Sequence, residues 1–98
     1  MRDTLYNQGD MKPKVYIDVR RPEEFATGRL PGARNISIEE DPQAVDEIIA
    51  LSAANDVVVY CYSTVRSKYV CTLLETKHGI KVGELEGGLM LYQGPIEA

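Results

Sequence analysis

Residues 56–67 read DVVVYCYSTVRS, which combines a strand, a cysteine and the start of a helix. The unbroken apolar run at 57–60 predicts a strand buried inside a parallel sheet, and it is too short to span a membrane. The run ends on Cys61, and the apolar residues take helical spacing from about Val65 onward. We therefore expect Cys61 at the carboxyl end of a central strand, where open α/β sheets place their ligands.

Strands and helices are expected to alternate along the rest of the chain. The predicted strands are residues 14–19, 33–38, 57–60 and 81–85, with at most one more short strand at 4–6. The predicted helices are residues 22–27, 42–51, 65–77 and 89–93. This alternation makes βαβ units, so we predict an α/β fold with a mostly parallel sheet and helices on both faces.

Proline and acidic residues mark the starts of two of these helices. Pro22 is followed by Glu23 and Glu24, which suit the positive end of a helix. In the second case Asp41 is expected to cap a helix whose first residue is Pro42.

Length and composition exclude several classes of protein. The 98 residues suit a single domain spanning 1–98, and 44% hydrophobic and 27% charged residues are ordinary for a globular protein. A net charge of −4 argues against broad nucleic-acid binding. The first 14 residues contain no apolar segment typical of a secretory signal or membrane anchor, so we expect a cytoplasmic protein without a membrane partner.

The cysteine and histidine content predicts neither a disulfide nor a metal site. Cys61 and Cys71 are the two cysteines, and a helix between them would hold their Cα atoms roughly 9 Å apart, beyond the about 7 Å limit for a disulfide. His78 is the single histidine and forms no zinc-ligand spacing with Cys71.

Cys61 has two interpretations, a small buried hydrophobe or a nucleophile. Its position favours the second, because loop amides and the helix dipole would stabilise a thiolate there. Arg66 and Lys68 add positive charge nearby, although each alone would suit a solvated surface. Together they describe an anion site with a nucleophile at its base. Cys71 lies among apolar helix residues, where core packing is expected.

Four segments in order resemble a single-domain rhodanese of the sulfurtransferase family. They are IDVRRPEEF at 17–25, GRLPGARNI at 28–36, VVVYCYSTVRS at 57–67 and IKVGELEGG at 80–88. The resemblance implies a three-layer α/β fold whose mostly parallel sheet has five strands, or four if the N-terminal part is shortened. A shortened part would leave one sheet edge less covered, and we expect a monomer or a weak homodimer.

The resemblance also implies roles for individual residues. Cys61 would take a sulfur atom from a donor such as thiosulfate, form a persulfide and pass the sulfur to a thiol, cyanide or a sulfur-accepting protein, without a cofactor or metal. The six-residue active loop would comprise Cys61 itself and the residues Tyr62, Ser63, Thr64, Val65 and Arg66, with Arg66 holding the anionic donor. Ser67 would stabilise the start of the helix. Asp18 would accept hydrogen bonds from the loop, and Arg20 would pair with Glu24.

A departure from the family pattern and a related class of the same fold keep alternatives open. Thr64 stands where active relatives usually carry glycine, so either the loop bends differently or activity is weak. A non-catalytic rhodanese-like module that binds a partner protein is therefore one alternative. A phosphatase or arsenate reductase is another, but phosphatases of this fold have five residues between cysteine and arginine, whereas this chain has the four residues 62–65.

Overall fold

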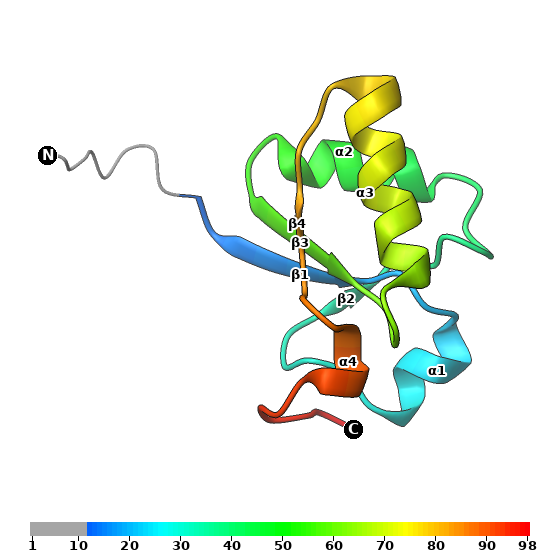
Figure 1. The fold of residues 1–98 in the computed structure, drawn as a ribbon, viewed down its shortest axis with the longest axis vertical. Coiled ribbons are helices and arrows are strands. Elements are labelled where there is room, and N and C mark those ends of the chain that lie inside the picture. Colours follow the sequence, from blue (N-terminus) through cyan, green and yellow to red (C-terminus); the bar gives the residue numbers. More distant parts are fainter. Residues whose placement is uncertain (1–11) are drawn as a thin grey trace, which may run out of the picture.

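The computed structural model describes residues 12–98, which form a four-stranded parallel sheet with four helices (Figure 1). The elements in chain order are β1 (Lys14–Asp18), α1 (Pro22–Thr27), β2 (Arg34–Asn35), α2 (Ala44–Ser52), β3 (Asp56–Tyr60), α3 (Val65–His78), β4 (Gly83–Glu84) and α4 (Gly88–Leu91). The predicted α/β fold is confirmed, and the sheet has four strands rather than five in the described residues. The short strand expected at 4–6 lies outside the described residues.

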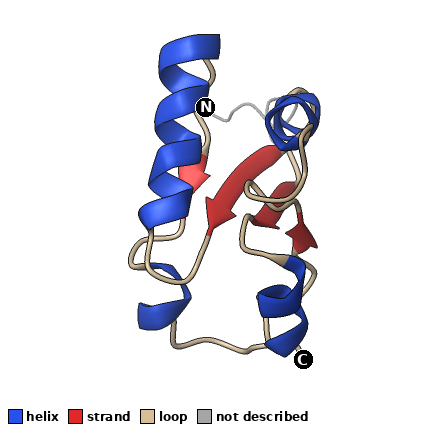
Figure 2. Ribbon diagram, turned by 90° about the vertical axis from the view of Figure 1, so that its right-hand side faces the viewer, coloured by secondary structure: helices blue, strands red, loops and turns tan. Residues whose placement is uncertain are grey.

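The sheet has the order β2-β1-β3-β4, and all its neighbours are parallel. The connections from β2 to β3 and from β3 to β4 cross the sheet in the same direction. Right-handed crossovers in one direction place their helices on one face, so α2 and α3 share a face. The sequence pattern predicted helices on both faces of the sheet. The short helices α1 and α4 instead lie beyond the carboxyl ends of the strands (Figures 1 and 2).

The core lies between this face of the sheet and the two long helices. Val57 and Val59 are two residues apart on β3, so their side chains point to the same face, and both are buried. They belong to one apolar cluster with Ile48 of α2 and Val70 of α3. Val58 and Tyr60 point to the other face, where Val58 is partly buried and Tyr60 is fully buried, so β3 is covered on both faces toward its carboxyl end. Cys61 belongs to the same cluster, so the core holds the end of β3 in place.

Two elements begin or end differently from their predictions. Helix α2 begins at Ala44 rather than Pro42, because the Asp41 carboxylate accepts a hydrogen bond from the Gln43 amide and closes a turn before the helix. The strand predicted at 33–38 has ladder pairing only over β2. Beyond β2 the Ile36 amide donates to the Asp18 carbonyl at 3.0 Å, and the Ile38 amide donates to the Val19 carbonyl at 3.1 Å. The chain therefore continues beside β1 without forming a regular strand.

The C-terminal elements are also shorter than predicted. The strand expected at 81–85 is limited to β4 at the sheet edge, although the Leu85 amide still donates to Val59. Helix α4 ends at Leu91, because Tyr92 has an extended backbone. Helix α3 agrees closely with its prediction, and Gly79 ends it in a left-handed conformation.

Candidate active site

Cys61 lies directly after β3, between β1 and β4 in the middle of the sheet, and the loop 61–64 leads into α3 (Figure 1). Two backbone amides point at its sulfur atom. The Thr64 N–H donates to Cys61 Sγ at 3.1 Å, and the Ser67 N–H donates at 3.4 Å. The Cys61 thiol and the Ser67 Oγ are also in contact, at 3.6 Å. The loop and the first turn of α3 thus wrap around the sulfur.

This arrangement lowers the pKa of the Cys61 thiol below its ordinary value. Burial by itself raises the pKa, because it disfavours the charged thiolate. Hydrogen bonding from Ser67 and from the backbone amides of Thr64 and Arg66 outweighs burial. The geometry therefore favours a nucleophilic thiolate.

Thr64 adopts the positive φ that is unfavourable for a β-branched residue. Its φ is 85°, and it is the one non-glycine residue with positive φ in the part of the chain that the structure describes. A β-branched residue in this conformation costs about 1–2 kcal/mol. The loop therefore keeps its tight bend in spite of Thr64, and the Thr64 amide still points at the sulfur.

Helix α4 holds the outer side of the loop. The Leu89 N–H donates to the Cys61 carbonyl at 3.0 Å, and the Met90 N–H donates to the Tyr62 carbonyl at 2.9 Å. Gly88 has a φ of 66° and lies so close that a Cβ atom there would overlap the Tyr62 carbonyl. From sequence the paired glycines suggested only a turn. In the structure they let α4 satisfy the loop carbonyls, which leaves the loop amides free to point inward.

The sulfur is covered in this conformation. Cys61 has no exposed surface, whereas Tyr62 is 50% and Val65 is 73% exposed. Ser63 is exposed as well. Of the expected loop residues, Thr64 and Ser67 contact the sulfur, while Tyr62, Ser63 and Val65 face outward. A molecule that reacts with Cys61 therefore reaches the sulfur only after the covering atoms shift.

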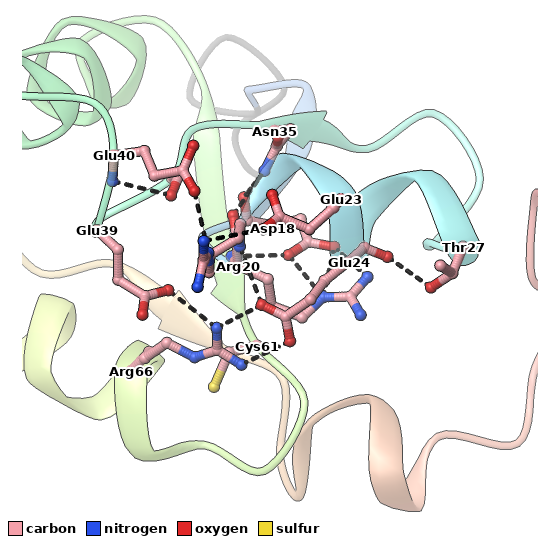
Figure 3. Close-up of polar contacts among 12 residues, drawn as sticks. Asp18, Arg20, Glu23, Glu24, Thr27, Asn35, Glu39, Glu40, Cys61 and Arg66 are labelled. Atoms are coloured by element: carbon pink, nitrogen blue, oxygen red, sulfur yellow. Dashed lines mark hydrogen bonds and ion pairs between the residues drawn. The ribbon is translucent and has the colours of Figure 1, made fainter.

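Arg66 is paired with two carboxylates (Figure 3). Its guanidinium donates to both oxygens of Glu24, at 2.7 and 3.1 Å, and to Glu39 Oε1 at 3.0 Å. The hydrogen bond from Arg66 lowers the pKa of Glu24 to about 2. The expected pairing of Arg20 with Glu24 is therefore wrong, because Arg66 occupies that carboxylate.

Arg20 instead pairs with Asp18, and both side chains are buried (Figure 3). The Arg20 backbone amide and Nε donate to Asp18 Oδ1 at 2.9 and 3.0 Å, and Arg20 Nη2 donates to Asp18 Oδ2 at 2.7 Å. Nη2 also donates to the Gly28 carbonyl at 2.6 Å. The prediction that Asp18 accepts hydrogen bonds from the active loop is wrong, since Arg20 satisfies both of its oxygens. The pair fixes the chain around α1.

Cys71 has a different environment. Both cysteines are free in the structure. Cys71 is partly buried and packs against the core, as expected. Burial and the nearby charge of Glu84 raise the pKa of its thiol to about 11.

Sequence reasoning missed three acidic partners in this region. Glu24 and Glu39 bind Arg66, and Glu84 of β4 accepts a hydrogen bond from the Ser67 hydroxyl at 2.7 Å. The chain carries no local signal for these contacts, because their partners are 17 to 42 residues away. Across residues 12–98, we find neither a cluster of metal-ligating side chains nor a helix long and apolar enough to cross a membrane.

Comparisons with known proteins agree with this geometry. The family model of the rhodanese-like domain matches residues 1–94. YtwF of Bacillus subtilis is 36% identical over 78 residues, which cover 80% of this chain and 72% of YtwF. The thiosulfate sulfurtransferase GlpE of Stutzerimonas stutzeri is 29% identical over 79 residues, covering 81% of this chain and 70% of GlpE.

A solved structure shows the same fold. The rhodanese-like domain of the Alr3790 protein from Anabaena sp. superimposes with a TM-score of 0.73 at 27% identity, covering 89% of this chain and 83% of that domain. The central strand, the loop around the cysteine and the fold all agree with membership of one family. The chain belongs to the rhodanese-like domain family, whose relatives include sulfurtransferases.

Proposed function

We propose that this protein is a sulfurtransferase that carries a sulfur atom as a persulfide on Cys61. The observation that carries the proposal is the pair of amides, from Thr64 and Ser67, that point at a sulfur whose pKa is lowered. Fixed amide dipoles of this kind stabilise negative charge on sulfur without reorganising during the reaction. A separate general base is not needed once the thiolate is formed.

The reaction has two steps. The Cys61 thiolate attacks the outer sulfur of a donor such as thiosulfate, a new sulfur–sulfur bond forms, the donor's own bond breaks, and sulfite leaves with the electron pair. A thiolate acceptor, cyanide or the cysteine of an acceptor protein then attacks the outer sulfur, and the Cys61 thiolate leaves. Thiosulfate is supported by the name of GlpE.

Arg66 is the proposed binding residue for the anionic end of the donor. Its bidentate pair with Glu24 is the stronger one, while Glu39 is 46% exposed and accepts one hydrogen bond. An incoming anion would therefore displace Glu39 and leave Glu24 in place. Tyr62, Ser63 and Val65 would form the rim that the donor passes, and the Asp18–Arg20 pair would support the site from β1.

Mass spectrometry of the intact protein tests the proposal directly. After incubation with thiosulfate, we expect the mass of one added sulfur atom, located on Cys61 by peptide mapping and removed by cyanide. Cys61→Ser should lose the modification completely, and Cys71→Ser should keep it. An unmodified protein after treatment with thiosulfate, mercaptopyruvate, polysulfide and glutathione persulfide would contradict enzymatic sulfur transfer.

A non-catalytic binding module is the second candidate. It is favoured by the complete burial of Cys61 and by the pairing of Arg66 with two carboxylates. In that case the exposed Tyr62, Val65 and Tyr69 would form a contact surface for a partner protein. The same mass measurement separates the candidates, because a module of this kind takes up no sulfur.

A further inference from the structure

Ser67 stands between Cys61 and a carboxylate that has no role in the proposed reaction. The side chain of Ser67 is fully buried, and its oxygen has three neighbours. They are Glu84 Oε2 at 2.7 Å, the Thr64 carbonyl at 3.2 Å and Cys61 Sγ at 3.6 Å. A hydroxyl group has a single hydrogen to donate. Each orientation of that hydrogen therefore serves one neighbour at the expense of the others.

The carboxylate of Glu84 is the strongest acceptor of the three. Hydrogen bonds to an ionised oxygen are shorter and roughly twice as strong as neutral ones, and the Ser67–Glu84 distance is the shortest. With its hydrogen directed at Glu84, Ser67 presents a lone pair toward Cys61. A lone pair accepts the hydrogen of a thiol but repels a thiolate. In this orientation only the backbone amides stabilise the charged sulfur.

We propose that Glu84 is a positioning residue that controls the protonation of Cys61 through the Ser67 hydroxyl. The ionised carboxylate holds the hydroxyl hydrogen and keeps Cys61 more often as a thiol. When Glu84 is replaced by a residue that does not accept this hydrogen bond, the hydrogen turns toward the sulfur and stabilises the thiolate. The proposal rests on the proposed function only in taking Cys61 as the reactive group.

The charged groups around this relay come from α3 and β4. Lys68 Nζ contacts Glu84 Oε1 at 3.4 Å, and Lys68 is largely exposed. Cys71 and Glu75 lie on the same helix, and the charges of both Glu84 and Glu75 raise the pKa of Cys71. Arg66, also on α3, is engaged by Glu24 and Glu39. Ser67 is thus the group that joins Glu84 to Cys61 by hydrogen bonds.

The solvent contact of Glu84 suits a control element. Its side chain is 21% exposed, whereas Cys61 and Ser67 are fully covered. The carboxylate is therefore in contact with solvent, while the sulfur and the hydroxyl are not. A change at this carboxylate alters the nucleophile without any movement of the loop 61–64.

The test measures the rate of alkylation of Cys61 against pH in a Cys71→Ser background, where one cysteine remains. Glu84→Gln keeps the shape of the side chain but replaces the ionised acceptor by a neutral amide, which holds the hydroxyl hydrogen less strongly and can itself donate to Ser67 Oγ. We expect the midpoint of the pH profile to fall by about one unit, a roughly tenfold larger thiolate fraction below the midpoint. Lys68→Met should leave the midpoint nearly unchanged, because it removes the other partner of Glu84 and leaves Ser67 in place.

Two further variants separate the hydrogen bond from the charge alone. Glu84→Asp keeps the charge but shortens the side chain, so the contact with Ser67 is lost and the midpoint should also fall. In Ser67→Ala, adding Glu84→Gln should move the midpoint by less than half as much as it does with Ser67 present. The proposal is overturned if Glu84→Gln leaves the midpoint in place or raises it. It is also overturned if Glu84→Asp behaves like the parent, or if the shift persists in full without Ser67.

This experiment is independent of sulfur transfer. Alkylation reports whether the thiol is protonated, even in a protein that takes up no sulfur from any donor. A shifted midpoint without persulfide formation would refute the proposed function and keep the relay. Persulfide formation with an unchanged midpoint would support the proposed function and refute the role of Glu84. Where both hold, the pH profile of persulfide formation should move with the alkylation midpoint.

Discussion

The surroundings of Cys61 and Cys71 differ more than their positions in the sequence suggest. Both thiols are free, both pack against the same core, and burial raises the pKa of each. At Cys61 the backbone amides of Thr64 and Ser67 reverse that effect. At Cys71 the thiol makes only a long contact with the Gly83 carbonyl, at 4.0 Å, and the charge of Glu84 raises the pKa further. Convergent N–H groups, rather than burial, distinguish a nucleophile from a packing residue.

The convergence depends on backbone that is held in place from outside. The Thr64 bend is strained, and the amides of α4 bind the loop carbonyls on the opposite side from the sulfur. Cys71 lies within a regular helix, whose own amides are used in helical hydrogen bonds. The two cysteines should therefore respond differently to changes in the loop, in α4 and in pH.

The largest expected effect comes from Gly88→Ala. The added Cβ would overlap the Tyr62 carbonyl at a residue with positive φ, so α4 has to move away from the loop. We expect a loss of about 2–4 kcal/mol in the free energy of unfolding, measured in urea, together with a higher alkylation midpoint for Cys61.

Gly79→Ala is the matched control for that change. Gly79 also has positive φ, but nothing lies within 4 Å of the added Cβ. It should cost only about 1 kcal/mol and leave Cys61 unchanged. Equal losses for the two variants would mean that the contact between α4 and the loop is unimportant.

The next largest effect is the difference between the alkylation midpoints of Cys61 and Cys71. In Cys71→Ser the remaining Cys61 should be alkylated with a midpoint below the ordinary thiol pKa. In Cys61→Ser the remaining Cys71 should show a midpoint near 11. Midpoints that coincide would remove the basis for treating the cysteines differently.

The same shifts predict opposite effects on stability. The lowered pKa of Cys61 adds stability above the unfolded thiol pKa of about 8.5, and this contribution is lost as pH falls through the folded value. The raised pKa of Cys71 contributes stability below about 8.5, and it is lost as pH rises toward 11. Urea titrations of the two single-cysteine variants at pH 7 and 10 measure both signs.

A smaller effect is expected from Thr64→Gly. Glycine adopts positive φ without strain but gains entropy in the unfolded chain, so the net stabilisation should be up to about 1 kcal/mol in urea. The Thr64 amide remains, and the alkylation midpoint of Cys61 should stay in place. The control is Thr72→Gly in the exposed interior of α3, which should instead destabilise by about 1 kcal/mol. A loss of stability in Thr64→Gly would show that the bend is not strained.

The smallest effect is expected from Glu24→Gln. This change breaks a bidentate pair with Arg66 that is partly exposed, so the cost at pH 7 should be about 0.5–1 kcal/mol. The pKa of Glu24 is lowered to about 2, so its contribution is present above about 4.3 and disappears as pH falls toward 2. Urea unfolding at pH 7 and pH 3 tests this, with the exposed Glu23→Gln as control. The Cys61 midpoint should not move, because Glu24 binds the guanidinium rather than the sulfur.

The sequence alone determined the order of the elements and the place of Cys61. The apolar run of β3, the helical spacing after Val65 and the stop at Gly79 are local patterns, and each depends on neighbouring residues. Pro22 with two following acids marked α1 in the same way. Such signals can be read from the sequence because each one lies within a single element and does not depend on which distant residues the fold brings next to it.

Only the tertiary structure decided which side chains meet at the site. Glu24 pairs with Arg66 and not with Arg20, and the Ser67 hydroxyl donates to Glu84. The amides of α4 donate to carbonyls of the loop. These contacts join residues 17 to 42 positions apart, and one carboxylate is as suitable as another by sequence. The choice depends on which strand ends and helix termini the parallel sheet brings to the same edge, and that is a property of the whole fold.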